Sequence, residues 1–479
     1  MAKTSKSSLK PVAGMNRKQR RSLRRQLSSA DPGLEIVNRN AAGIDVGNQS
    51  HYVAVPADRD AVAVQEFGCW TADLERLCEW LEACRIQTVV MQATGVYWIP
   101  LYDQLRQHGF SVAVVNAQHT KNVPGRKTDV QEAQWLMKLH TYGLLRGSFQ
   151  LEGEMEKVRT LWRLRARHVA EAGRAVQHMQ KALTKMNVQL ANVLSDISGV
   201  SGQAIIGAIL EGKRDPLELA AMKHERVRAS LEEVARSLEG NWREDLLFEL
   251  RQAVEHYQFA HQQMRACDVQ LQSYLDKLPT RSLEGAAKPA QAAPKKARQS
   301  KPKGNAPNFD LRSCLSRIAG VDLTSIDGIE VLTAQTILSE VGPDLSAFAD
   351  ENRFASWLGL TPSKDISGGK VIRSGSRKVQ NRVAASVRMA ATTLKQSKSY
   401  LGARYRYLCR KLPSKTAAVK AMARQLAVLV YRLLTKGQAW VDAGAAQFER
   451  RRECLDLLGL EKRAAARGFR LIPITGESA

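Results

Sequence analysis

Three carboxylates and one amide lie in short segments whose patterns could hold a divalent metal ion. Asp45 interrupts an apolar run, and Gln92 comes near the end of the β-rich run 88–93. Asp129 and Glu132 open a helical pattern three residues apart, so both side chains lie on one helix face. Mg²⁺ prefers oxygen ligands and promotes attack on phosphodiesters when separated acids converge around it. The spacing therefore predicts a site for Mg²⁺, with two ions expected and Asp45, Gln92, Asp129 and Glu132 as ligands.

Each acid also has a purely structural interpretation. Asp45 could be a solvated strand end that caps the turn at 47–49. Asp129 could cap a helix, with Glu132 in the first turn, where the helix dipole favours anions. The order of the segments favours the metal interpretation, because a strand acid, a polar strand end and a helix with paired acids follow one another within residues 45–132.

A candidate nucleophile lies far downstream. Ser367 is followed by two glycines and stands in a strongly basic tract whose one acid is Asp365. Ser-Gly-Gly is usually only a turn, but glycines let a backbone approach a ligand and cations stabilise charge on a transferring phosphoryl group. Two more cations directly precede Thr128 and would suit the phosphates of a cleaved strand. The predicted nucleic-acid-binding residues are Arg126, Lys127, Lys364, Lys370, Arg373, Arg377 and Lys378.

The charge balance points to a polyanionic partner. The chain has 479 residues with 72 Lys and Arg against 47 Asp and Glu, a net charge of +25. Such a charge favours long-range, salt-dependent attraction to nucleic acid, although a ribosome-associated or simply basic protein would share it. No apolar run of about 18 residues appears, so no membrane partner is expected. Scattered cysteines and the absence of a secretory pattern predict a reducing compartment.

The elements that must position these residues form an α/β pattern followed by helices. Residues 35–150 predict the strand and helix order of an RNase H-like (RuvC-like) fold. The expected strands are 41–46, 51–56, 62–67, 88–93 and 111–116, and the expected helices are 71–84, 98–108 and 128–142. Residues 1–34 predict a basic disordered arm that becomes helical around 16–27 on phosphate.

Residues 151–283 predict a helical, coiled-coil domain. Apolar residues recur in a heptad seam at Ala172, Val176, Met179, Leu183, Met186, Leu190 and Val193. A second long helix is expected at about 241–278. The two helices could form either an antiparallel hairpin within the chain or an intermolecular coiled coil. A flexible linker (284–308), a mostly helical domain (309–440) and a charged tail (441–479) follow. Residues 326–329 resemble a helix-hairpin-helix element, and a plain tight turn explains them equally well.

Taken together, these segments resemble insertion-sequence transposases of the "one-ten" family, in particular its eleven-eleven subgroup. The resemblance runs from about residue 40 to 440. It rests on Gly43-Ile44-Asp45-Val46-Gly47, Ala93-Thr94-Gly95-Val96-Tyr97-Trp98-Ile99-Pro100, Asn122-Val123-Pro124-Gly125-Arg126-Lys127-Thr128-Asp129, Gln134-Trp135, Gly199-Val200-Ser201-Gly202, Ala208-Ile209-Leu210-Glu211-Gly212, Arg214-Asp215-Pro216 and Ile366-Ser367-Gly368-Gly369-Lys370.

The resemblance implies a four-acid (DEDD) RuvC-like domain, a coiled-coil dimerisation insert and a C-terminal transposase domain that supplies a nucleophilic serine. It implies recombination through a phosphoserine link, directed by an element-encoded structured RNA, in a dimer or tetramer that spans donor and target DNA in the bacterial cytoplasm, on nucleoid DNA. By position Asp45 is the first acid, Asp129 the third and Ser367 the nucleophile. Gln92 stands where the second acid is expected, and Glu132 where the fourth Asp is expected.

Three functions remain in competition. The first is the RNA-guided transposase or recombinase. The second is a junction nuclease of the RuvC or RNase H type that would use metal-activated water and ignore Ser367. The third is a catalytically impaired, basic nucleic-acid-binding protein, since Gln92 removes one charge from the metal site. A covalent protein–DNA adduct separates the first from the others.

Overall fold

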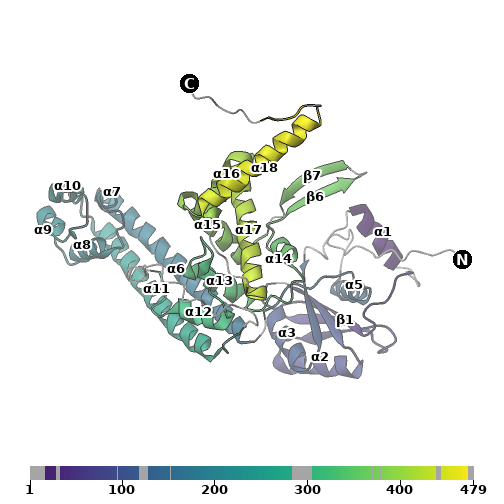
Figure 1. Cartoon of the computed structure of the whole chain (residues 1–479). Coiled ribbons are helices and arrows are strands. Elements are labelled where there is room, and N and C mark those ends of the chain that lie inside the picture. Colours follow the sequence, from purple (N-terminus) through teal and green to yellow (C-terminus); the bar gives the residue numbers. More distant parts are fainter. Residues whose placement is uncertain are drawn as a thin grey trace. The chain divides into compact units, whose positions relative to one another are not determined.

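The chain folds into two compact units, Met1–Gln150 and Leu151–Ala479, which are described separately (Figure 1). The computed structural model describes residues 17–27, 33–93, 95–117, 128–151, 153–282, 305–367, 370–376, 379–437 and 444–472. Its N-terminal unit is a mixed α/β sheet domain, and the C-terminal unit is mostly helical. The predicted combination of an α/β domain with a helical region is therefore confirmed.

The N-terminal unit is built on one five-stranded sheet in the order β3-β2-β1-β4-β5. Strands β1, β2 and β3 pair antiparallel, and β1, β4 and β5 pair parallel. The strands are β1 (Ala41–Val46), β2 (Ser50–Ala54), β3 (Val64–Gly68), β4 (Thr88–Ala93) and β5 (Ser111–Asn116). The sequence placed all five to within two residues at each end.

Helices cover both faces of this sheet. Ile44 of β1 belongs to the core cluster formed with α2 (Thr71–Ala83) and α3 (Trp98–Gln107). On the opposite face, Val90 of β4 packs with Leu136 of α5 (Asp129–Thr141). Because side chains alternate along a strand, Gly43, Asp45 and Gln92 belong to the face that α5 covers.

The N-terminal arm differs from the expected disorder over part of its length. Residues Arg17–Leu27 form helix α1, in which Leu23 and Leu27 are buried against Leu139 and Leu144. This packing is difficult to predict from the basic composition of the segment, because only two leucines, one helical turn apart, contribute buried apolar side chains. Residues 1–16 and 28–32 lie outside the described residues.

The C-terminal unit begins with an antiparallel helical hairpin of α6 (Glu154–Lys185) and α11 (Glu244–Lys277). The ion pairs Arg165–Asp268 (2.5 Å) and Lys185–Glu249 (2.6 Å) fix the antiparallel direction, because one partner number rises as the other falls. The short helices α7 (Leu190–Val193), α8 (Val200–Leu210), α9 (Pro216–Ala220) and α10 (Leu231–Ser237) lie between them in the chain.

Residues of the predicted heptad seam pack within this intrachain hairpin and its connecting helices. Leu183 and Leu190 are buried in one cluster with residues of α8, α10 and α11. The seam was expected to continue through Val193 in one helix, but α6 ends at Lys185 and the chain turns at Asn187, whose φ is +59°. The hairpin alternative is therefore the one that the structure contains.

Over its remaining described residues, this unit consists of helices, their connections and one β-hairpin that the sequence did not predict, β6 (Pro362–Ser367) and β7 (Lys370–Ser376). The helices are α12 (Leu311–Ala319), η2 (Leu323–Ser325), α13 (Val331–Val341), α14 (Glu351–Trp357), α15 (Arg382–Thr393), η3 (Leu394–Gln396), α16 (Tyr400–Lys411), α17 (Lys415–Lys436) and α18 (Ala445–Ala465). Of the predicted linker, residues 284–304 lie outside the described residues. Across the described parts of the chain, no helix is long and apolar enough to cross a membrane.

A buried histidine ties the last turn of α5 to the sheet and should make the N-terminal unit sensitive to acid. His140 is 8% exposed and hydrogen-bonds Thr88 Oγ1 through Nε2 at 2.8 Å. Burial lowers the pKa of His140 to about 4, below its ordinary value of 6.5. The native state thus binds fewer protons than the unfolded state between these values, so stability is lost as the pH falls from 6.5 toward 4.

We expect this loss to reach about 3 kcal/mol, since one pKa unit corresponds to about 1.4 kcal/mol. His140→Gln keeps a hydrogen-bonding group near the Nε2 position but does not titrate, so its unfolding midpoint should fall less with acid. Urea unfolding of both proteins at pH 7.5 and 4.5 measures the difference. Parallel pH profiles would show that His140 does not control the acid response.

Candidate metal and nucleic-acid site

Helix α5 runs antiparallel to β1 and β4. Its last turn lies at the start of both strands, where His140 contacts Thr88 and the His140 carbonyl accepts from Asn38 Nδ2 at 2.7 Å. Thr88 begins β4 and pairs with Ala41 at the start of β1. The first turn of α5 therefore points toward the carboxyl ends of the two strands.

Gly43 sets how closely the helix approaches the sheet. A Cβ at this position would lie 2.2 Å from Met137 N and 2.5 Å from Ala133 O, both backbone atoms of α5. No larger residue fits without moving the helix. Asp45 lies two residues after Gly43 in β1, on the same face of the sheet. Asp129 lies one helical turn before Ala133 in α5. The close packing at Gly43 thus brings the two acids toward each other from strand and helix.

Four polar side chains form a row across the sheet under the start of α5. Asp45 pairs with Tyr52 of β2, and Tyr52 pairs with Glu66 of β3. On the other side Ile44 pairs with Met91, so the register places Gln92 beside Asp45. Directly opposed residues share one face of a sheet. The row therefore reads Gln92, Asp45, Tyr52, Glu66, with Gln92 buried and Asp45 half-buried.

The start of α5 lies beside this row. The pKa of Tyr52 is raised first by its hydrogen bond to Glu66, then by burial and by the negative charges of Glu66 and Asp129. Hydrogen bonds from Ser50 and Tyr52 lower the pKa of Glu66. Tyr52 thus stays protonated and Glu66 ionised at neutral pH. Helix α5 also packs against β2 and β3, the strands that carry Tyr52 and Glu66.

The N-cap of α5 is Thr128, whose Oγ1 accepts from Gln131 N at 3.3 Å. The capping alternative for Asp129 is therefore wrong, and its exposed carboxylate does not serve the helix end in that way. Glu132 lies one turn later and is half-buried. Sequence reasoning missed Tyr52 and Glu66, because alternation along β2 and β3 does not show which of their residues share the face of Asp45 until the register is known.

The donor chemistry of this site suits Mg²⁺, because Asp45, Gln92, Asp129 and Glu132 all offer hard oxygen atoms. Within the ranges that the structure describes, however, no three Asp, Glu, His or Cys side chains lie close enough together to hold a metal ion by themselves. Oxygen atoms from another molecule would have to complete a coordination shell. Phosphate oxygens of nucleic acid are of the right kind.

The C-terminal unit places Ser367 at the tip of a strand. Ser367 is the last residue of β6 and pairs with Lys370, while Asp365 pairs with Arg373 and Lys364 with Ser374. The register shifts between Asp365 and Ile366, a β-bulge next to the serine. Of the other predicted residues, Arg126, Lys127, Arg377 and Lys378 lie outside the described residues.

The turn at 326–329 packs against α15. Gly328 has φ +88°, and a Cβ there would lie 3.1 Å from the Ala390 carbonyl oxygen. Asp327 accepts a hydrogen bond from Ser397 Oγ at 2.9 Å. Positive φ and close packing are sufficient to account for the glycine, and phosphate binding by this turn stays a prediction.

Enlarging Gly43 should displace α5 and with it Asp129. We expect Gly43→Ala to lower the free energy of unfolding by about 1–3 kcal/mol, the usual cost of overpacking, and to reduce DNA cleavage at temperatures where the protein remains folded. Thermal unfolding and cleavage are measured on the same preparations. Gly147→Ala is the control, because its Cβ would meet nothing closer than Ala113 Cβ at 3.7 Å. Equal stability and activity of the two variants would refute the packing argument.

Comparison with known protein families gives two matches. Residues 42–188 match a transposase model of the IS110 DEDD type, and residues 322–406 match a model described as the transposase IS116/IS110/IS902 family. The first match contains the polar row and the start of α5, and the second contains the β6–β7 hairpin. No curated protein matches the chain.

Proposed function

The chain carries transposase domains of the IS110 family, and we propose that it is a DNA transposase that cleaves and exchanges strands with the acids around Asp45 and with Ser367. The observation that carries this proposal is the antiparallel packing of α5 on β1. It gathers Asp45, Gln92 and Asp129 at one edge of the sheet in the unit that matches the first transposase model.

The acids would act by holding two Mg²⁺ ions against the scissile phosphate. Bound Mg²⁺ would neutralise charge on the phosphate and stabilise the attacking and leaving oxygens. The residues themselves have distinct positions: Asp45 and Gln92 come from adjacent strands, whereas Asp129 and Glu132 come from one helix turn. The incomplete donor set supports a site that assembles only with DNA bound, because DNA phosphate oxygens supply the missing ligands.

Ser367 would act as the nucleophile. Its Oγ forms a bond to phosphorus while the bond from phosphorus to one deoxyribose oxygen breaks, and the hydroxyl proton leaves to that oxygen or to water. When a deoxyribose hydroxyl of the second DNA attacks the phosphorus of this phosphoserine diester, the bond from phosphorus to Ser367 Oγ breaks, and the proton of the attacking hydroxyl passes to Oγ directly or through water. A serine at a strand tip beside a β-bulge and opposite Lys370 is well placed for such a role.

The transposase would also need nucleic-acid partners and further copies of the same chain. The net charge of +25 suits simultaneous binding of donor DNA, target DNA and an element-encoded structured RNA that directs the reaction. Two DNA partners require two active sites, so we propose a dimer or tetramer. Since the α6–α11 seam is used within the chain, other surfaces would form that assembly.

Ser367→Ala should abolish covalent attachment to DNA but leave DNA binding within about twofold, because a neutral hydroxyl adds little to phosphate affinity. Trapping of the protein on end-labelled DNA under denaturing conditions measures the adduct, and fluorescence anisotropy measures binding. Ser374→Ala, a second serine of the same hairpin, should behave like the parent. An undiminished adduct in Ser367→Ala would remove this serine from the mechanism, and cleavage without any adduct would favour the junction nuclease.

The Mg²⁺ dependence should follow the charge of the polar row. Gln92→Glu adds the carboxylate that is missing from the four-acid pattern, so half-maximal cleavage should need less Mg²⁺. Asp45→Asn should lower cleavage at least about 100-fold, since even outer partners of metal ligands typically contribute 10- to 100-fold. Cleavage titrated against Mg²⁺ in the three proteins tests this. Robust activity of Asp45→Asn would show that these acids are not the metal site.

A further inference from the structure

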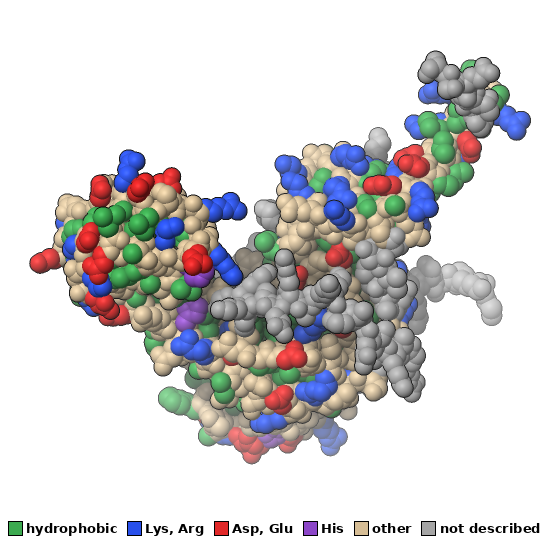
Figure 2. Space-filling model, turned by 60° about the vertical axis from the view of Figure 1, so that its left-hand side comes forward, with side chains coloured by type: hydrophobic (Ala, Val, Ile, Leu, Met, Phe, Trp, Pro, Cys, Tyr) green, Lys and Arg blue, Asp and Glu red, His purple; other side chains and the backbone are tan. Residues whose placement is uncertain are grey.

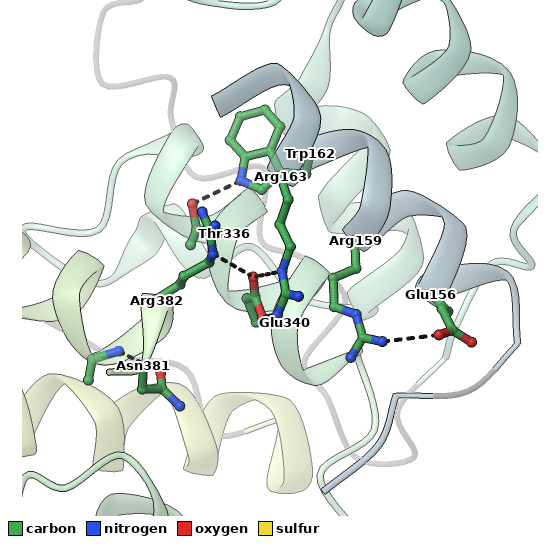
Figure 3. A network of polar contacts seen from close by, with 9 residues as sticks. Glu156, Arg159, Trp162, Arg163, Thr336, Glu340, Asn381 and Arg382 are labelled. Carbon is green, nitrogen blue, oxygen red and sulfur yellow. Dashed lines mark hydrogen bonds and ion pairs between the residues drawn. The ribbon is translucent and has the colours of Figure 1, made fainter. Parts of the chain in front are cut away.

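An almost buried carboxylate lies among three arginines where α6, α13 and α15 meet (Figure 3). Glu340 of α13 is 9% exposed. It accepts from Arg163 of α6 twice, from Nε at 2.9 Å and from Nη2 at 2.5 Å. Arg382 of α15 approaches the same carboxylate with Nε at 3.8 Å. Two guanidinium groups from different helices are thus oriented by one acid.

The cluster has more positive than negative charge. Arg159, one turn before Arg163, pairs with Glu156 at 3.2 Å. Three arginines therefore face two glutamates, which leaves one positive charge. The pKa of Arg159 is lowered first by burial and then by the charge of Arg163, as expected where cations crowd together. An anion bound here would relieve that repulsion.

The guanidinium groups of Arg163 and Arg382 are accessible to solvent. The side chains of Arg163 and Arg382 are 45% and 56% exposed, whereas that of Glu340 is 9% exposed. Each guanidinium has five N–H donors, and Glu340 engages at most two from either arginine. The remaining donors can serve a ligand. Lys and Arg side chains are spread over the face of the molecule seen in Figure 2, so net charge alone does not single out this place. What distinguishes this place is that two guanidinium groups are oriented by the same carboxylate, that of Glu340.

Hydrogen bonds hold the helices that carry the cluster in place. Trp162 Nε1 donates to Thr336 Oγ1 at 3.1 Å, which joins α6 to α13 beside the Arg163–Glu340 pair. Arg382 is the first residue of α15, where Asn381 caps the helix by accepting from Ala384 N at 3.0 Å. A cation at a helix N-terminus opposes the helix dipole, whereas an anion there is favoured. The helix end and both arginines thus attract the same kind of ligand.

We propose that Arg163 and Arg382, oriented by Glu340, bind a backbone phosphate of a nucleic acid. Planar guanidiniums match the oxygen geometry of phosphate and stay charged at all relevant pH values. Helix α15 follows β7 after five residues, so the bound phosphate belongs to the nucleic acid that is presented to the Ser367 hairpin. The proposal rests on the proposed function, and it adds a positioning contact outside the predicted nucleic-acid-binding residues.

The test is the salt dependence of binding by the full-length protein, with a DNA duplex in one arm and a structured RNA in the other. Each lost phosphate contact lowers the slope of log K against log salt by about 0.9 for duplex DNA. We expect Arg382→Gln to show this decrease with one of the two ligands and a roughly 3- to 10-fold weaker affinity at 0.1 M salt. The ligand that responds identifies the source of the phosphate. Arg382→Lys should retain most of the slope.

Arg312→Gln is the matched control, because Arg312 is 54% exposed and also pairs with one carboxylate, Asp322 at 2.6 Å, but outside the cluster. Equal slopes for Arg382→Gln and Arg312→Gln with both ligands would overturn the phosphate site while leaving the proposed function intact. A parent protein that bound neither ligand would instead refute the proposed function. Because Arg382 is more than half exposed, the folded state does not depend on it, and thermal unfolding of Arg382→Gln checks this.

Discussion

The contact between the backbone of α5 and the glycine of β1 is the constraint on which the candidate site depends. At Gly43 the helix lies so close to the strand that even a methyl group would overlap Met137 N and Ala133 O. This contact fixes the height of the helix over the sheet, and the hydrogen bond between His140 and Thr88 places the last turn of the helix at the start of β4. With height and direction set, the helix start must lie over the carboxyl ends of β1 and β4. Asp129 is near Asp45 for that reason.

A polar row on an otherwise apolar sheet needs stabilisation of its own. Asp45 and Gln92 are partly or largely removed from water, and polar groups in such positions require hydrogen-bonding or charged partners. Tyr52 and Glu66 extend the row toward solvent, and the hydrogen bonds from Ser50 and Tyr52 keep Glu66 ionised. The row thus runs from a buried amide to an exposed carboxylate. A nucleic acid that approached from the exposed end would meet the negative charge of Glu66, and bound cations would reduce that repulsion.

Much of this arrangement could be predicted from local sequence. Strand alternation and helix periodicity located the five strands and helices α2, α3 and α5 of the N-terminal unit, and acids three apart located the helix face of Asp129 and Glu132. Tyr52 and Glu66 escaped notice because their roles depend on strand register, which the sequence alone leaves open. The β6–β7 hairpin escaped because Ser-Gly-Gly indicates a turn without indicating what flanks it. A helix around 16–27 was expected only on phosphate, and its packing against the unit escaped prediction because two leucines, Leu23 and Leu27, provide its buried apolar side chains within a basic segment.

The C-terminal unit follows a different principle, in which charge organises the packing. Arg165 and Asp268 are both almost fully buried within the α6–α11 hairpin, where breaking a buried pair typically costs about 3–5 kcal/mol. Such a pair specifies the register of two long helices whose apolar contacts would tolerate sliding. Two residues before Arg165, Arg163 of α6 pairs with Glu340 of α13, which Arg382 of α15 also approaches. Glu340 thus links the long helix α6 to the start of α15, the helix that follows the Ser367 hairpin.

We propose that the carboxyl ends of β1 and β4 and the first turn of α5 contribute ligands to one shared Mg²⁺ site. Substitution of Fe²⁺ for Mg²⁺ in the DNA-bound protein, followed by ascorbate and peroxide, cuts the backbone within reach of the bound ion. Mass spectrometry locates the cuts. The account predicts cleavage near Asp45, near Gln92 and at residues 129–132, all suppressed by excess Mg²⁺. Cuts confined to one of these segments, or cuts that excess Mg²⁺ does not suppress, would contradict it.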